Sequence, residues 1–162
     1  MTLAWNVRGD FGVDEFAATV ERLFALALPM QPNTSTRADD AALLWVGPTS
    51  WLYVTEADSS RISFEDARRL LNAIGGALFD VSSSYVGWRV AGAASSRVLN
   101  RGCPLDLGND AFPTGHCAQS TLGHTTILVH RPDTSVAFIV LAPRSYARDA
   151  LHLLQTAALT EG

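Results

Sequence analysis

Residues 101–119 read RGCPLDLGNDAFPTGHCAQ, and this segment holds both cysteines and two of the seven prolines of the chain. Gly102 and Pro104 are expected to end the helix before it, because glycine favours a left-handed helix cap and proline disfavours helical backbone at the preceding residue. The segment is too broken for a helix and too apolar for a mobile linker, so we predict an ordered loop. Three apolar side chains are expected to anchor the loop in the core: Leu105, Leu107 and Phe112. A loop of this length inside a compact domain is usually functional or lies at an interface.

The composition predicts one domain with much buried surface. A chain of 162 residues favours a single domain, residues 1–162, with a sizeable core. Charged residues make up 17% of the chain, below the usual share of about 25%, which suggests extra buried surface in the core or in a subunit interface. The formal net charge of −4 argues against a nucleic acid or an anionic membrane as the partner.

The sequence also predicts the compartment. Residues 1–8 lack a basic start followed by an apolar core, so we expect no signal peptide. The longest apolar run, Leu23–Leu28, is too short to cross a bilayer, and two cysteines are too few for a disulfide framework. We therefore expect a cytoplasmic protein whose thiols are reduced.

Hydrophobic periodicity predicts strands that alternate with helices. Strands are expected at residues 3–7, 41–46, 51–55, 77–81, 85–91, 118–122, 125–130 and 136–141. Helices are expected over 13–27, 64–74, 92–101 and 143–157, the first stopped by Pro29 and the last beginning at Pro143. Ser63 and Asp66 resemble a capping box. The helices recur between antiparallel hairpins, which favours an α+β fold, a mainly antiparallel sheet packed with three to four helices.

The cysteines and histidines suggest two kinds of chemistry. Cys103, His116, Cys117 and His124 are the candidate metal ligands, but the cysteines are 14 positions apart and lack the close-set pairs of zinc sites. Neighbouring residues of an extended chain point to opposite faces, so His116 and Cys117 are not expected to meet one ion. Cys103 as a nucleophile would need a histidine base, and no Cys-His signature is present. We favour buried, unligated thiols that act as small hydrophobic groups.

The remaining candidates have structural interpretations. Asp106 is expected to accept local backbone N–H bonds rather than to contact a ligand. The tryptophans are Trp5, Trp45, Trp51 and Trp88, and core packing is the default for each, with one or two at a subunit interface as the second interpretation. No dinucleotide or nucleoside-triphosphate motif occurs in the sequence.

Several motifs follow one another along nearly the whole chain. They are Leu44-Trp45-Val46-Gly47-Pro48 with Trp51, then Cys103-Pro104-Leu105-Asp106-Leu107, Cys117-Ala118-Gln119 and Pro143-Arg144-Ser145-Tyr146. In this combination the chain resembles the gamma subunit of heterotetrameric sarcosine oxidase. Three positions depart from that family: Thr49-Ser50 stands where it often has Asp-Glu, and Trp88 stands where an aliphatic residue is common.

The resemblance implies a non-catalytic accessory subunit of a complex that oxidatively demethylates sarcosine to glycine with tetrahydrofolate as the one-carbon acceptor. It implies alpha, beta and delta subunits as partners, chiefly alpha. FAD, FMN, NAD, zinc and tetrahydrofolate are expected on those other subunits, and no catalytic, cofactor or metal residue is expected on this chain. The resemblance also implies a fold similar to part of the glycine-cleavage aminomethyltransferase.

The family motifs supply the candidate site residues. The motif and possible interface positions are Cys103, Pro104, Leu105, Asp106, Leu107, Cys117, Gln119, Trp51 and Trp88. The alternative function is a stand-alone folate or one-carbon binding protein that kept the aminomethyltransferase-like fold.

Overall fold

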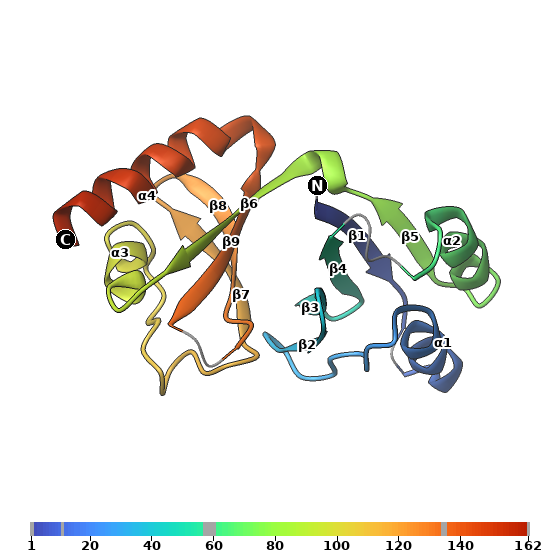
Figure 1. Ribbon diagram of the computed structural model, residues 1–162. Coiled ribbons are helices and arrows are strands. Elements are labelled where there is room, and N and C mark those ends of the chain that lie inside the picture. The colour runs from blue at the N-terminus through green and yellow to red at the C-terminus, as the bar shows by residue number, and fades with distance from the viewer. Residues whose placement is uncertain (1, 11, 57–60, 134–135, 162) are drawn as a thin grey trace. The chain divides into compact units, whose positions relative to one another are not determined.

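The computed structural model describes residues 2–10, 12–56, 61–133 and 136–161. The chain divides into two compact units, residues 1–82 and residues 83–162 (Figure 1). Each unit has its own antiparallel sheet, its own helices and its own hydrophobic core. The expectation of one domain over residues 1–162 stays a prediction.

The first unit is a five-stranded antiparallel sheet in the order β2-β3-β4-β1-β5, with two helices. Its elements are β1 (Thr2–Arg8), α1 (Asp14–Phe24), β2 (Ser35–Ala38), β3 (Ala41–Gly47), β4 (Ser50–Glu56), α2 (Phe64–Asn72) and β5 (Ala77–Asp80). The predicted hairpin is confirmed as β3 and β4, which Pro48 and Thr49 join. Ser63 caps α2 as predicted, because its hydroxyl accepts a hydrogen bond from the Asp66 N–H at 3.2 Å.

Aromatic side chains fill the core of the first unit. Trp5 and Tyr53 lie opposite each other on β1 and β4, with ring centroids 5.5 Å apart. Phe24 of α1 stacks on Tyr53 at 4.5 Å, and Phe64 of α2 meets Trp5 edge-on at 5.4 Å. Each such pair stabilises the fold by about 0.5–1.5 kcal/mol beyond the area that it buries.

The prediction that Pro29 stops the first helix is wrong. Helix α1 ends at Phe24, because Ala25 takes a left-handed conformation (φ 55°) and its N–H donates to the Glu21 carbonyl at 2.8 Å. The chain then turns so that Leu26 and Leu28 are buried in the core of this unit. In the sequence, Ala27 continues the helical spacing of Leu23 and Phe24, and only the tertiary packing distinguishes a helix from this inward turn.

The second unit is a four-stranded antiparallel sheet in the order β6-β9-β8-β7, with α3 and α4 (Figure 1). Its elements are β6 (Tyr85–Ala91), α3 (Ser95–Asn100), β7 (Cys117–Leu122), β8 (Thr125–His130), β9 (Ala137–Pro143), the 3-10 turn η3 (Arg144–Tyr146) and α4 (Ala147–Glu161). Buried Leu99, Phe112, Val129, Val140 and Leu154 belong to its core.

Two expectations about strand ends are wrong. The strands expected at residues 77–81 and 85–91, on either side of Ser82–Ser84, do not form a hairpin, because β5 pairs with β1 whereas β6 pairs with β9. The Ser82 hydroxyl accepts from the Ala4 N–H at 3.0 Å, so the chain follows β1 at this turn instead of folding back on β5. Pro143 is the last residue of β9 rather than the first of a helix, and α4 begins at Ala147 after η3.

Four helices and two antiparallel sheets in the described residues confirm the α+β class. In the same residues, no helix has both the length and the apolar character that a bilayer crossing requires.

Candidate functional site

The loop that follows α3 is ordered and partly buried, as its sequence predicts. It occupies residues 101–116, and the last part of the motif, Cys117 to Gln119, begins strand β7. Leu107 and Phe112 are buried in the core of the second unit. Leu105 is only half-buried, so the expectation that it is a full anchor is wrong. The reason is local: the Asn100 side chain donates to the Leu105 carbonyl and holds this residue at the margin of the core.

Arg131 holds the loop against the sheet, and sequence reasoning missed it. Its guanidinium is buried, donating to the Phe112 carbonyl at 3.0 Å and to the Asn109 amide oxygen at 2.6 Å. It also lies over the Phe138 ring, 5.6 Å from the centroid. The backbone joins the same network, since the Gly115 N–H donates to the Arg131 carbonyl and the Arg131 N–H donates to the His116 carbonyl.

Asp106 has the structural role that the sequence predicts. Its carboxylate accepts from the Gly108 N–H at 3.0 Å, while the side chain remains at the surface. The polar side chains in and beside the loop therefore form hydrogen bonds mainly with the loop itself; they are Asn100, Asp106, Asn109 and Arg131. This pattern is that of a self-supported structural loop rather than of a site that presents convergent polar groups to a ligand.

The two cysteines are buried and are not joined in a disulfide. Cys103 Sγ lies 3.6 Å from Ser120 Oγ, within hydrogen-bonding distance of a serine hydroxyl. Within residues 2–10, 12–56, 61–133 and 136–161, no three His, Cys, Asp or Glu side chains gather closely enough to hold a metal ion. The candidate set of Cys103, His116, Cys117 and His124 is thus not brought together as a metal site.

The tryptophans named with the motif lie in different environments. Trp51 is fully buried in the first unit, where its Nε1 donates to the Pro29 carbonyl at 2.8 Å and its ring lies 5.7 Å from that of Phe16. Trp88 on β6 is only partly buried against the core of the second unit. Of these two residues, only Trp88 keeps part of its side chain accessible to solvent.

Glu161 joins the two helices of the second unit. At the end of α4, it accepts from Arg97 Nε at 2.9 Å and from Arg101 at 2.7 Å. The hydrogen bond from Arg97, and to a smaller extent the one from Arg101, lowers the pKa of Glu161 below its usual value. Sequence reasoning missed the group because the partners are at least 60 positions apart in the chain.

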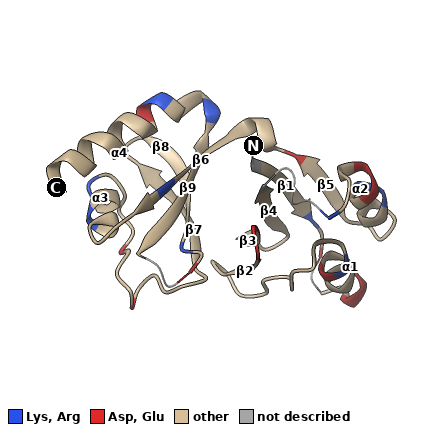
Figure 2. Cartoon of the chain, viewed as in Figure 1, with Lys and Arg blue, Asp and Glu red and all other residues tan. Residues whose placement is uncertain are grey.

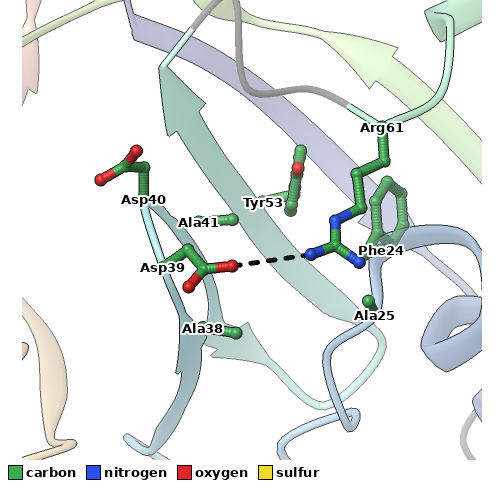
Figure 3. Close-up of a pocket in the computed structure, with 8 residues that line it drawn as sticks. All are labelled: Phe24, Ala25, Ala38, Asp39, Asp40, Ala41, Tyr53 and Arg61. Carbon is green, nitrogen blue, oxygen red and sulfur yellow. Dashed lines mark ion pairs between the residues drawn. The ribbon is translucent and has the colours of Figure 1, made fainter.

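A pocket of about 230 Å³ opens on the first unit beside the β2–β3 turn (Figure 3). Phe24 and Tyr53 form its apolar wall, and Asp39 and Arg61 make an ion pair at 3.5 Å. Both charged side chains are largely exposed, so the pair contributes little to stability. Burial raises the pKa of Tyr53, with smaller opposite effects from Thr55 and Arg61. The phenol therefore stays protonated near neutral pH and does not provide a base.

A larger groove of about 480 Å³ lies on the second unit. We call it the β6–α4 groove, because its walls come mainly from β6, from the turn before α3 and from α4. Trp88, Val90, Leu151, Leu154 and Ala158 supply much of its apolar surface. The buried Ser95 hydroxyl at its edge donates to the Val136 carbonyl at 3.4 Å, so this polar group is already satisfied.

Comparison with known proteins gives a consistent result. The family described as SoxG, sarcosine oxidase gamma subunit family, matches residues 8–160. Sarcosine oxidase subunit gamma of Corynebacterium sp. (strain P-1) is 28% identical over 153 residues, which cover 92% of this chain and 72% of that protein. Sarcosine oxidase subunit gamma of Arthrobacter sp. is 28% identical over 118 residues, 70% of this chain and 56% of that protein.

Two solved structures share the fold. A chain of heterotetrameric sarcosine oxidase from Corynebacterium sp. U-96, in complex with pyrrole 2-carboxylate, has a TM-score of 0.86 at 22% identity, covering 96% of this chain and 78% of that one. Glycine cleavage system aminomethyltransferase T from Bartonella henselae has a TM-score of 0.66 at 16% identity, covering 94% and 43%. These likenesses confirm the expected aminomethyltransferase-like α+β fold, and the match over residues 8–160 places the chain in the sarcosine oxidase gamma subunit family.

Proposed function

We propose that this chain is a non-catalytic accessory subunit of a sarcosine oxidase-type complex. The complex would oxidatively demethylate sarcosine to glycine and pass the one-carbon unit to tetrahydrofolate. The observation that carries the proposal is the family match, which extends over residues 8–160 rather than over one local motif. The internally satisfied loop at residues 101–116 supports a structural role for the motif that most resembles the family.

The partners in this proposal are alpha, beta and delta subunits, with alpha as the chief contact. FAD, FMN, NAD, zinc and tetrahydrofolate would be bound by those chains. The name of the solved relative, a heterotetrameric enzyme, supports an assembly of several subunits. A cytoplasmic location belongs to the same proposal.

The motif residues divide into two groups by their exposure. Pro104, Asp106 and Gln119 are exposed and Trp88 is half-buried, so we assign possible partner contacts to these positions. The others are buried or half-buried and serve packing: Cys103, Leu105, Leu107, Cys117 and Trp51.

Co-expression tests the proposal. An affinity-tagged copy of this chain is produced together with the alpha, beta and delta subunits of the same organism, and a parallel culture lacks this chain. We expect the three subunits to co-purify with the tagged chain and the oxidase to be unstable or poorly assembled without it. Full oxidase activity in its absence, together with failure to co-purify, would exclude the proposal.

The alternative function is a stand-alone tetrahydrofolate-binding protein, supported by the fold likeness to aminomethyltransferase T. Titration of the isolated chain with tetrahydrofolate, followed by tryptophan fluorescence, separates the two functions. Saturable binding at micromolar concentration would favour the alternative, whereas an unchanged spectrum agrees with the accessory role.

A further inference from the structure

Helix α4 has an unusual surface for a helix at the outside of a unit. Residues 150–160 include no Asp, Glu, Lys or Arg, and the middle of α4 has the colour of uncharged residues (Figure 2). A surface helix normally carries charged residues on the side away from the core. Here Leu151 is 38% exposed and Leu159 is 85% exposed. Leu151 also lines the β6–α4 groove, and exposed apolar surface that forms a large contiguous patch marks an interaction site.

Strand β6, beside this surface, lies at the edge of the sheet of the second unit. It is an edge strand, paired with β9 on one side, and none of its residues is buried. Natural edge strands are usually protected by prolines, bulges, several charges or shortness. This one is seven residues long, pairs with β9 in continuous register from Tyr85 to Ala91, and contains one charged residue, Arg89.

The β6–α4 groove joins these two features. An apolar cavity of about 150 Å³ accepts a molecule of the size of benzene, so a groove of about 480 Å³ has room for two or three apolar side chains. Successive side chains of a strand point to opposite faces, which lets a segment paired to β6 place every second side chain in the groove. An open strand edge beside an apolar groove is the geometry of peptide recognition by strand addition.

The charges around the groove further restrict the occupant. Arg89 lies on β6, and Arg97 and Arg101 lie beside Glu161 at the α3 end. Arg89 and Glu161 line the groove itself, whereas Arg97 and Arg101 reach it only through their pairs with Glu161, so the rim has a net positive charge at its Glu161 end. This rim favours a segment that carries acidic residues. If two copies of this chain paired through β6, their positive rims would face each other, and this repulsion disfavours self-pairing.

We propose that β6 and the β6–α4 groove form the docking site for an extended, acidic segment of a partner subunit. The segment adds as a strand to the free edge of β6 and inserts alternate apolar side chains between Trp88 and α4. This inference rests on the proposed function, since it specifies where the accessory subunit meets its complex.

Hydrogen–deuterium exchange of the isolated chain and of the assembled complex tests the site. We expect the amides of residues 85–91 that do not donate to β9 to exchange at least about tenfold more slowly in the complex. The comparison strand is β2, one of the two edge strands of the other sheet, whose residues 35–38 should change little. Protection of β6 that depends on the concentration of the isolated chain would instead indicate a second copy and overturn the choice of partner.

A pair of variants provides a second readout. Ala158 is exposed and lines the groove, so Ala158→Trp should fill it and weaken incorporation into the complex at least about tenfold. Ala18 is an exposed alanine of α1 in the first unit, and Ala18→Trp is the matched control that should leave incorporation unchanged. Equal behaviour of the two variants contradicts the inference.

The outcomes separate the two proposals. If the chain does not enter the complex at all, the proposed function fails. If it enters the complex while β6 exchanges as in the isolated chain and Ala158→Trp is incorporated normally, the docking site fails and the accessory function stands.

Discussion

Replacement of Arg131 by methionine is expected to loosen the loop at residues 101–116. Arg131→Met keeps most of the aliphatic volume but removes the hydrogen bonds to the Phe112 carbonyl and to the Asn109 amide oxygen, as well as the contact with the Phe138 ring. The carbonyl of Phe112 then remains in the buried interior without this donor. The variant thus tests whether the guanidinium stabilises the loop or only occupies space.

The expected magnitude follows from the contacts. Hydrogen bonds to a charged group contribute about 1.5–3 kcal/mol each, so two of them amount to about 3–6 kcal/mol. The substitution also relieves two costs, the burial of a charge and the buried Nε for which the described residues provide no acceptor. We therefore expect a net loss of about 2–3 kcal/mol in the free energy of unfolding.

Urea denaturation measures this loss. With a slope of about 1–3 kcal/mol per molar urea, the midpoint should fall by about 1 M. Arg148→Met, a change of an exposed arginine on α4, is the control and should alter stability by less than about 0.5 kcal/mol. If Arg131→Met is as stable as the unsubstituted chain, the cost of burying the guanidinium cancels its contacts and the reasoning is refuted.

Three further predictions concern other parts of the structure. Leu107→Ala should destabilise the chain by about 2–5 kcal/mol, and Leu105→Ala by clearly less, because only the first leucine is fully buried; equal losses in thermal or urea unfolding would contradict this order. Glu161→Gln should be less stable than the unsubstituted chain at neutral pH and equally stable in acid. Folding lowers the pKa of Glu161, so its carboxylate stabilises the folded chain at pH values above the unfolded pKa. This stabilisation is lost as the pH falls through the folded pKa. A difference that persists at the lowest pH would show that packing rather than charge is responsible. Finally, if residues 1–162 form one domain, fluorescence and circular dichroism should report a single coincident unfolding transition, and two separated transitions would show that the units unfold independently.

The sequence predicted most elements because local signals and tertiary structure agree there. The alternating pattern of β1, the β3–β4 hairpin and the Ser63 cap all depend on residues close together in the chain. The errors lie where a tertiary contact overrides the local pattern. Ala25 ends α1 before Pro29 because the following leucines turn into the core, and the Ser82 contact with Ala4 directs the chain along β1.

The candidate site could be predicted only in part for the same reason. Leu107, Phe112 and the turn at Asp106 follow from the apolar and turn-forming residues of the loop itself. Arg131 and Glu161 were missed because their partners are distant in sequence, and an isolated arginine or glutamate carries no local signal of burial or pairing. The β6–α4 groove likewise depends on how an edge strand and a helix pack together.

Native mass spectrometry of the oxidase complex, purified through a tag on another subunit, tests the accessory role most directly. The account predicts an assembly that contains this chain in equal number to the alpha subunit, and a loss of intact assembly when this chain is left out. An intact, fully active assembly whose mass excludes this chain would contradict it.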